Sequence, residues 1–223
     1  TENPPLTINL PSLHEYQAAI QNPQNCFEDA RLKSCTTETD QFGLPRVRSG
    51  RFALTYKLQN ERQTWAVRCF HKSAPDREAR YLEISKYLSA QSSPYLVKVD
   101  YLPKGILVKG ISYPITLMEW VDGDTLEKFL FNNYINSRVV GNLITEFQKL
   151  VSDLESRHIA HGDLSHRNII IRNQKMLLVD YDGIFVPLLG GKLSSELGNI
   201  NFQHPLRNEK DFGPTIDRFS SIA

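Results

Sequence analysis

The stretch at residues 161–183, H-G-D-L-S-H-R-N-I-I-I-R-N-Q-K-M-L-L-V-D-Y-D-G, decides the fold that we expect for this chain. It contains two short apolar segments, Ile169–Arg172 and residues 176–179. The polar residues 173–175 separate them, which is typical of two strands joined by a tight turn. The stretch therefore predicts a β-hairpin that follows a polar loop.

Three oxygen-bearing side chains flank the expected hairpin. Asp163 opens the polar loop, Asn168 ends it, and Asp180 follows the second strand. Because a hairpin returns the chain to its starting point, we expect Asp180 beside Asn168, with Asp163 close by. Hard divalent cations prefer oxygen ligands. The sequence thus predicts a site for a divalent cation bound to a phosphate tail.

This spacing resembles the catalytic and magnesium loops of the protein-kinase superfamily, H-R-D-L-x-x-x-N followed by D-F-G. The resemblance implies that Asp163 orients the acceptor hydroxyl and accepts its proton. It also implies that Asn168 and Asp180 hold Mg²⁺ on ATP. Asp182 replaces the glycine of D-F-G, and it is either a further metal ligand or a cap of the turn.

Other residues of the loop depart from the usual Ser/Thr-kinase form. Gly162 replaces the arginine of H-R-D, which contacts a phosphorylated activation loop in the family, so activity would not depend on that phosphorylation. H-G-D is also the form of aminoglycoside- and choline-kinase-like enzymes. Arg167 matches the D-L-A-A-R-N form of tyrosine kinases, and it either neutralises the transferred phosphoryl group or faces solvent. His161 is expected to pack and hydrogen-bond rather than react.

Composition narrows the possible classes of partner. The 223 residues suffice for one domain or two small lobes. The 26 basic and 25 acidic residues nearly cancel, which indicates neither a nucleic-acid nor a membrane partner. No apolar run is long enough to span a membrane, and Cys26, Cys35 and Cys69 lack a metal-binding spacing. We expect a cytoplasmic protein with reduced thiols.

The N-terminal region, residues 1–43, is expected to be an extension that packs on the small lobe. Residues 1–10 are polar and contain prolines, which is typical of a loose arm. Helical spacing predicts a helix over Leu13–Ile20, with Ser12 as its N-cap. Residues 21–45 are polar and rich in turn-forming residues.

Residues 46–58 predict two strands joined by a tight turn, and they resemble a degenerate kinase phosphate-covering loop, G-x-G-x-x-G-x-V. Gly50 matches the middle glycine, where the backbone approaches the phosphates. Arg48 and Ala53 stand in place of the other two glycines. Arg48 or Arg51 would add positive charge above the phosphates.

The alternating segment Thr64–Phe70 predicts a strand that resembles the V-A-I-K strand of the family. Ala66 would contact the nucleotide. Arg68 replaces the lysine that holds the phosphates and pairs with a helix glutamate. Arginine keeps the charge but is bulkier and forked. Arg68 therefore either bridges the phosphates and that glutamate or fills the pocket, as in an inactive module.

A helix is predicted over residues 75–90. Its expected apolar face comprises Ala79, Leu82, Tyr87 and Leu88. Glu83 best matches the family's paired glutamate when counted back from S-P-Y-L-V, and Glu78 is the alternative. Strands are then expected over residues 95–102, 105–109 and 115–118.

The segment M-E-W-V-D-G-D-T-L resembles the hinge of the kinase family. Met118 would lie at the back of the adenine pocket. The residues expected to offer backbone hydrogen bonds to adenine are Glu119, Trp120 and Val121. Asp124 either holds the ribose hydroxyls or forms a capping box with Glu127 at the start of the next helix.

Residues 138–223 are expected to form the rest of the large lobe that this sequence contains. Residues 138–157 place their apolar side chains on one face and predict the longest helix. The segment after Gly183 resembles an activation segment. Residues 216–223 resemble the start of a further helix, in which Asp217 would brace the catalytic loop from below. We expect a further segment or subunit to complete this lobe.

Together these features predict an α+β, protein-kinase-like two-lobed fold. The small antiparallel-sheet lobe is expected at residues 44–121, and the mainly helical large lobe, truncated near its central helix, at residues 122–223. The expected function is ATP- and Mg²⁺-dependent transfer of the γ-phosphoryl group to Ser/Thr hydroxyls of a protein substrate. The alternatives are a pseudokinase that senses nucleotide or binds a signalling partner, and a small-molecule kinase.

Overall fold

The computed structural model of the protein describes residues 9–74 and 76–223. Most of the expected loose arm, residues 1–8, and the expected helix start at residue 75 lie outside the described residues. Within them the chain combines an antiparallel sheet with several helices, so the expected α+β class is confirmed. Among the helices described there, none combines the length and the apolar character that crossing a bilayer requires.

The chain divides into two compact units. Unit 1 comprises Thr1–Pro75 and Asp100–Trp120, and unit 2 comprises Asp76–Val99 and Val121–Ala223. The N-terminal extension therefore belongs to the same unit as the large sheet. The segment Asp76–Val99, which the sequence alone grouped with the small lobe, has its contacts within unit 2.

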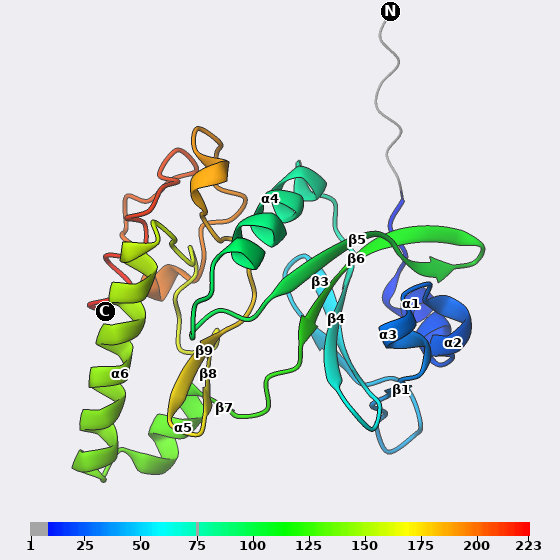
Figure 1. The fold of residues 1–223 in the computed structure, drawn as a ribbon, viewed down its shortest axis with the longest axis horizontal. Coiled ribbons are helices and arrows are strands. Elements are labelled where there is room, and N and C mark those ends of the chain that lie inside the picture. Colours follow the sequence, from blue (N-terminus) through cyan, green and yellow to red (C-terminus); the bar gives the residue numbers. More distant parts are fainter. Residues whose placement is uncertain (1–8, 75) are drawn as a thin grey trace, which may run out of the picture. The chain divides into compact units, whose positions relative to one another are not determined.

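Unit 1 is built on a six-stranded sheet with the order β1-β3-β4-β6-β5, in which β2 also pairs with β3 (Figure 1). Its strands are β1 (Thr36–Thr37), β2 (Val47–Ser49), β3 (Ala53–Gln59), β4 (Thr64–Phe70), β5 (Val99–Val108) and β6 (Ile111–Glu119). The strand predicted at Thr64–Phe70 and the strand pair predicted within residues 46–58 are thus confirmed.

One prediction for this sheet is wrong. The two strands expected at residues 95–102 and 105–109 form the single strand β5, which a turn at Lys109 and Gly110 joins to β6. Both turn residues have positive φ, as two-residue hairpin turns require. Because β5 lies at the edge of the sheet, Pro103 costs little pairing there.

Three helices precede the sheet: α1 (Leu13–Ile20), α2 (Pro23–Cys26) and α3 (Ala30–Lys33). The prediction for α1 is confirmed together with its cap, since the Ser12 hydroxyl accepts from the Glu15 N–H at 3.4 Å and the Glu15 carboxylate accepts from the Ser12 N–H at 2.8 Å. The short α2 and α3 were not predicted. They are single turns whose helical period is too brief to detect.

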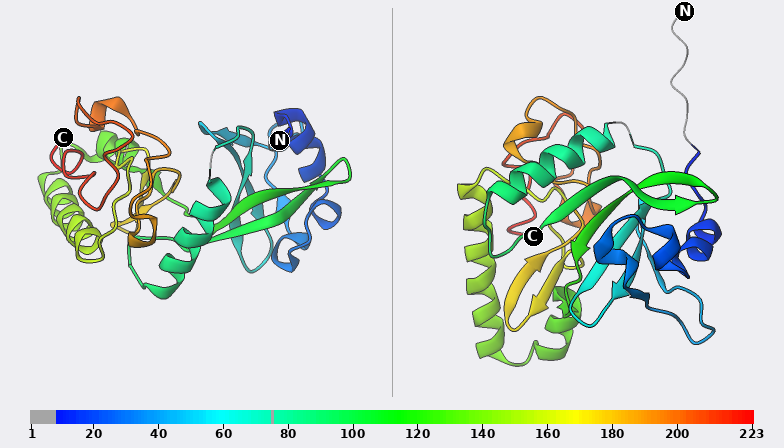
Figure 2. Two further views of the ribbon diagram at one scale, coloured as in Figure 1. Left: turned by 90° about the horizontal axis from the view of Figure 1, so that it is seen from above. Right: turned by 45° about the vertical axis from the view of Figure 1, so that its right-hand side comes forward.

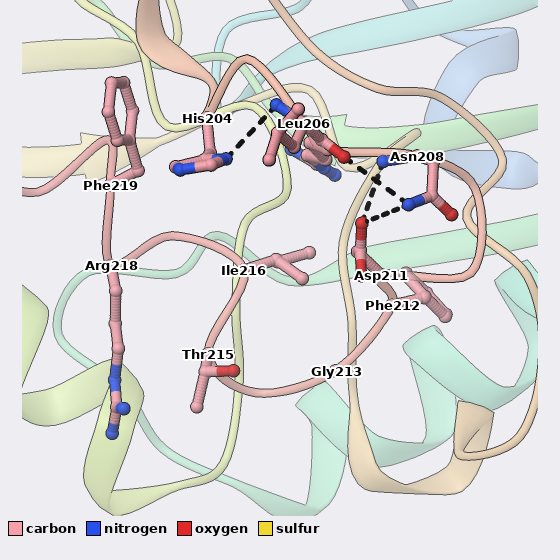
Figure 3. Close-up of a pocket in the computed structure, with 11 residues that line it drawn as sticks. His204, Leu206, Asn208, Asp211, Phe212, Gly213, Thr215, Ile216, Arg218 and Phe219 are labelled. Carbon is pink, nitrogen blue, oxygen red and sulfur yellow. Dashed lines mark hydrogen bonds between the residues drawn. The ribbon is translucent and has the colours of Figure 1, made fainter.

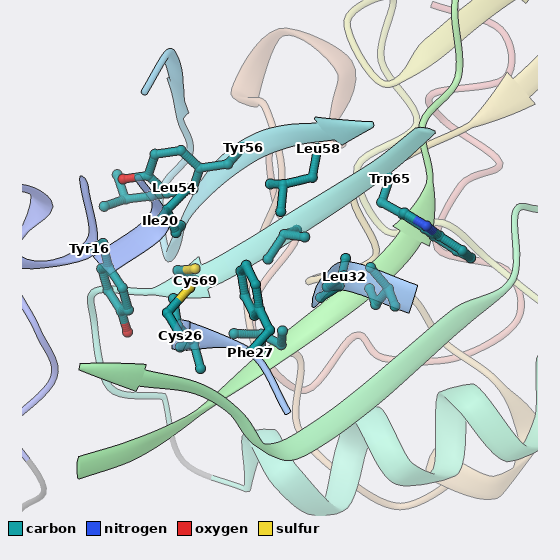
Figure 4. Close-up of a cluster of buried hydrophobic side chains, with 14 of the residues drawn as sticks. Tyr16, Ile20, Cys26, Phe27, Leu32, Leu54, Tyr56, Leu58, Trp65 and Cys69 are labelled. Carbon is teal, nitrogen blue, oxygen red and sulfur yellow. The ribbon is translucent and has the colours of Figure 1, made fainter. Parts of the chain in front are cut away.

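The core of unit 1 lies between these helices and one face of the sheet (Figure 4). From the helical side come Tyr16, Ile20, Cys26, Phe27, Leu32 and Cys35. The sheet side supplies alternate residues of each strand, such as Trp65, Val67 and Cys69 of β4. The Tyr16 hydroxyl also donates to the Phe70 carbonyl at 2.8 Å. These contacts bury one face of the sheet, so the opposite face is the one left for other functions.

Unit 2 contains a small sheet of order β7-β8-β9 and three helices. The strands are β7 (Asp124–Thr125), β8 (Ile169–Arg172) and β9 (Lys175–Leu178), and the helices are α4 (Arg77–Ala90), α5 (Leu126–Asn133) and α6 (Ser137–Ser156). The right-hand view of Figure 2 shows α6 alongside the β8–β9 hairpin. The predicted hairpin is confirmed, but its turn has two residues, Asn173 and Gln174, both at positive φ. Lys175, which was predicted in the turn, pairs with Arg172 in the strand.

Helix α6 confirms the longest predicted helix to within one residue at each end. Leu143, Leu150 and Leu154 are buried on the predicted face, whereas Ile144 is 56% exposed. Glu146 is buried instead, 3.2 Å from Lys175 of β9. A charged residue thus joins the buried face because it has a partner there.

The end of the chain differs from the prediction. Residues 216–223 form hydrogen-bonded turns rather than the start of an α-helix. The bonds from Ser221 N to Asp217 O (2.8 Å) and from Ala223 N to Phe219 O (3.1 Å) are helix-like but are not propagated. Two short 3₁₀ helices, Pro187–Leu189 and Ile200–Phe202, lie in the segment before it.

Candidate active site

The predicted catalytic loop is held from below by Asp217. Its carboxylate accepts from the backbone N–H of His161 and, at 2.9 Å, from that of Gly162. Burial raises the pKa of Asp217, which the nearby His161 and these two N–H groups oppose. The predicted bracing role is therefore confirmed. His161 is also buried, and its Nε2 lies 3.0 Å from the Val179 carbonyl, so it packs and hydrogen-bonds as predicted.

Gly162 is required by the backbone of unit 2. Its φ is +78°, and a Cβ placed there would lie 2.1 Å from the carbonyl oxygen of Gly183. The close approach excludes a side chain, and the positive φ disfavours one. The glycine at position 162 therefore has a steric reason, which is the close approach of the two loops.

Asp163 and Asn168 are joined directly. The Asn168 amide nitrogen donates to the backbone carbonyl of Asp163 at 2.9 Å and to its Oδ2 at 2.8 Å. Since both acceptors are oxygens, the orientation of the amide is determined and its oxygen points elsewhere. The other carboxylate oxygen of Asp163 accepts from the Asn199 N–H at 2.7 Å. Asn199 was not predicted, because no local pattern links it to Asp163.

The hairpin brings Asp180 back to Asn168, as predicted. The backbone carbonyl of Asn168 accepts from the Val179 N–H at 3.0 Å, so the β8–β9 pairing continues to the residue before Asp180. Asp180 itself has φ +67°, which is uncommon for a residue other than glycine. The Asn168 amide oxygen and the Asp180 carboxylate are oxygen donors of the kind that Mg²⁺ takes, and they fit the expected cation.

Asp182 has a partner that the sequence did not suggest. The hydroxyl of Tyr81, on helix α4, donates to Asp182 Oδ1 at 2.5 Å. The backbone carbonyl of Asp182 accepts from the Ser195 hydroxyl. In the described part of the chain, His, Cys, Asp and Glu side chains do not gather in threes at a possible metal centre.

Helix α4 presents a different face from the predicted one. Its buried residues are Arg80, Tyr81, Ile84 and Leu88. Of the predicted apolar face only Leu88 is among them, and Leu82 is 47% exposed. Arg80 is buried because its guanidinium donates to the Leu193 carbonyl and lies 5.3 Å from the ring centroid of Phe212. Because the buried face contains a charged residue, the spacing of the apolar residues alone did not reveal it.

The two glutamates predicted to pair with Arg68 lie on the less buried part of α4. Glu83 is half-buried and Glu78 is exposed. In the predicted catalytic loop, the Arg167 side chain is 70% exposed, and its Nε lies 3.7 Å from Glu127. Of the two roles considered for Arg167, exposure to solvent matches this geometry, with Glu127 as a loose partner.

Three of the residues predicted for the nucleotide site lie in unit 1 on the sheet face opposite its core. Ala66 and Arg68 alternate along β4 with the core residues Trp65, Val67 and Cys69. Across the sheet, Ala66 pairs with Met118, and Arg68 pairs with Thr116 and Thr55. Paired residues share a face, so Ala66, Arg68 and Met118 lie on the same face of the sheet. Arg68 is buried, at 5% exposure.

The β2–β3 turn contains Gly50, whose N–H donates to the Ala53 carbonyl at 2.9 Å. Arg48 pairs with Glu38 at 2.9 Å, and its guanidinium lies 4.4 Å from the Trp120 ring centroid. Arg51 lies over the Phe52 ring at 5.2 Å. Arg48 is thus already engaged within unit 1.

The hinge-like segment is partly used by the sheet. The Trp120 N–H donates to the Thr64 carbonyl at 2.9 Å, so it cannot also bind adenine. This excludes the Trp120 N–H as a donor to adenine and leaves Glu119 and Val121 as the candidates for a backbone N–H.

The expected capping box is also wrong. Helix α5 is capped by Thr125, whose hydroxyl accepts from the Lys128 N–H at 3.3 Å. Asp124 lies in β7, one residue too early to cap, and its carboxylate contacts Lys128 Nζ at 2.6 Å.

A pocket of about 650 Å³ lies elsewhere in unit 2, formed by the segment between His204 and Phe219 (Figure 3). None of the predicted site residues lines it. Arg207, at its wall, donates to the Gly162 carbonyl at 2.7 Å, and burial lowers the pKa of this guanidinium.

Comparison with known proteins assigns no family. No protein-family model matches the sequence. No curated protein is significantly similar to it. The function must therefore be inferred from the residues and their geometry.

Proposed function

We propose that this chain is an ATP- and Mg²⁺-dependent phosphotransferase with a protein-kinase-like two-lobed fold, and that it phosphorylates Ser/Thr hydroxyls of a protein substrate. The observation that carries the proposal is the position of Asn168. Its side-chain amide donates to Asp163, and its backbone carbonyl pairs with the residue before Asp180. Three residues of the family's motif are therefore linked through one side chain and one backbone pair.

In this proposal Asp163 orients the acceptor hydroxyl and takes its proton. The Asn168 amide oxygen and the Asp180 carboxylate would hold Mg²⁺, which offsets negative charge on the transferred phosphate when bound. The nucleotide-binding roles remain with residues of unit 1 and the segment after it: Gly50, Ala66, Arg68, Met118, Glu119 and Val121. Asp124 remains a candidate for the ribose hydroxyls, because it does not cap α5.

The test is phosphate transfer by Asp163→Asn, which keeps the size of the side chain but cannot accept a proton. We expect transfer from ATP to a generic protein substrate or to the chain itself to fall by at least about 10³-fold. Asp211→Asn is the matched control, since it changes an exposed carboxylate of the same unit. Equal transfer by Asp163→Asn and the wild type would refute the assignment.

A second candidate is a pseudokinase, favoured by two observations. Arg68 is buried where the family has a lysine, and the Asn199 N–H occupies one oxygen of Asp163. A thermal-shift titration with ATP, with and without Mg²⁺, separates the candidates. A shift without turnover indicates a nucleotide sensor, and no shift at millimolar ATP indicates a scaffold without nucleotide.

For the third candidate, a small-molecule kinase, the described residues give no observation that specifically favours it. It was suggested by Gly162, and the contact with Gly183 accounts for that glycine without reference to a substrate.

A further inference from the structure

The loop at residues 180–183 follows the β8–β9 hairpin and needs support from outside itself. Asp180 adopts φ +67°, a conformation that persists in a residue other than glycine only where surrounding contacts determine it. Its position within the proposed metal site therefore depends on what holds the residues that follow it.

Tyr181 supplies the first support. Its ring is fully buried, and its hydroxyl contacts the Val97 N–H at 2.8 Å, the Val97 carbonyl at 3.0 Å and the Leu178 carbonyl at 3.0 Å. These bonds fix the side chain next to Asp180 against the segment that follows helix α4. They leave the next residue, Asp182, to be held separately.

Asp182 is held by helix α4. The Tyr81 hydroxyl donates to its carboxylate at 2.5 Å, a hydrogen bond to a charged acceptor and thus of the stronger kind. Tyr81 is 3% exposed, so its ring has little freedom to move away. The helix is itself anchored in unit 2 by Arg80, whose guanidinium donates to the Leu193 carbonyl.

We propose that Tyr81 is a positioning residue for the metal-binding loop. It ties helix α4 to Asp182 and thereby sets the orientation of Asp180, two residues earlier. Asp182 then acts through its hydrogen bond to Tyr81, not as a ligand of the cation. The inference rests on the proposed function for the role of the metal, but the tie between α4 and the loop does not.

The test compares Tyr81→Phe with Tyr87→Phe. Each substitution removes one hydroxyl from the same helix. The Tyr81 hydroxyl donates to Asp182, whereas the Tyr87 hydroxyl donates to the Arg157 carbonyl at 2.8 Å, away from the loop at residues 180–183. Mg²⁺ is titrated at fixed ATP, with thermal stability as the readout, and ATP is titrated without Mg²⁺. We expect Tyr81→Phe to bind Mg²⁺ about tenfold more weakly in the presence of ATP, while its affinity for ATP without Mg²⁺ is unchanged. Tyr87→Phe should behave as the wild type in both titrations.

Asp182→Ala distinguishes positioning from ligation. If Asp182 acts through Tyr81, this variant and Tyr81→Phe lose similar Mg²⁺ affinity, and the double variant loses no more than either. If Asp182 binds the cation directly, Asp182→Ala is severely impaired while Tyr81→Phe resembles the wild type, which would overturn the proposal.

Amide hydrogen exchange tests the tie without nucleotide. We expect faster exchange over residues 179–184 in Tyr81→Phe and in Asp182→Ala, but not in Tyr87→Phe, while α6 stays protected in all three. Unchanged exchange over residues 179–184 would refute the tie. If the wild type shows no Mg²⁺-dependent ATP binding but the exchange pattern is as expected, the proposed function fails and the tie stands.

Discussion

Gly162 shows how one residue can carry a geometric requirement that looks like a functional signature. Its carbonyl accepts from Arg207, its N–H donates to Asp217, and its α-carbon faces the Gly183 carbonyl. Each of these contacts depends on the backbone alone. The H-G-D form therefore reflects the packing of two loops of unit 2.

We predict that Gly162→Ala destabilises the protein by more than about 3 kcal/mol, because the added Cβ meets backbone and φ is positive. Gly141→Ala is the control. Gly141 lies in α6 with open space around it, and alanine there should stabilise by about 0.5–1 kcal/mol. Urea denaturation of both variants gives the comparison, and equal midpoints would contradict the steric account.

Helix α5 shows that a cap can be displaced by one position from its apparent motif. Thr125 and Asp124 both precede the helix, and the D-T-L-E sequence allows either to be the N-cap. The helix begins at Leu126, so Thr125 directly precedes it and Asp124 lies one position too early to be its N-cap.

We predict that Thr125→Ala costs about 1 kcal/mol of unfolding free energy through loss of the cap. Asp124→Ala should cost less than about 0.5 kcal/mol, since it breaks only the exposed ion pair with Lys128. Thermal or chemical denaturation measures both. A larger loss in Asp124→Ala than in Thr125→Ala would favour the capping box after all.

Helix α1 carries a pH-sensitive contact with the β5–β6 turn. The hydrogen bond from Lys109 and those from Ser12 lower the pKa of Glu15 to about 2, from an ordinary value of 4.5. The carboxylate is therefore stabilised in the folded state. Its contribution is present above pH 4.5 and is lost as the pH falls toward 2.

We predict that an NMR titration finds the Glu15 carboxyl group well below its ordinary pKa, and that Lys109→Met raises it, because the largest cause is then removed. Glu15→Gln should flatten the part of the stability profile between pH 4.5 and 2. A Glu15 pKa unaffected by Lys109→Met would show that the contact does not persist in solution.

At the scale of the whole molecule, the predicted catalytic loop is organised by residues far along the chain. The Asp217 carboxylate accepts from two N–H groups that lie 55 and 56 residues earlier in the chain. The Asn199 N–H donates to Asp163, which lies 36 residues earlier. The loop thus depends on the folding of the last quarter of the chain.

We predict that Asp217→Ala destabilises unit 2 by about 2–5 kcal/mol, because two buried N–H donors lose their acceptor. Asp211→Ala, an exposed aspartate nearby, should change stability by less than about 1 kcal/mol. Hydrogen exchange at the His161 and Gly162 amides should rise in the first variant only. Protected amides in Asp217→Ala would mean that the loop has other supports.

Much of the local structure could be predicted because its signals are local. Helix α1 and its cap, the strand β4, the long helix α6 and the β8–β9 hairpin all follow from periodicity and turn chemistry over fewer than about twenty residues. The return of the chain from Asn168 toward Asp180 also follows from the hairpin, although its register is set by a two-residue turn where three residues were predicted.

The remaining features arise from contacts between distant segments, and no local pattern encodes them. The buried face of α4 depends on partners for Arg80 and Tyr81, and the Tyr81–Asp182 bond joins residues 101 positions apart. Periodicity ranks side chains by hydrophobicity, so it misses polar groups that are buried because a partner satisfies them. Local patterns thus determined which elements form, and tertiary contacts determined which polar residues support the candidate site.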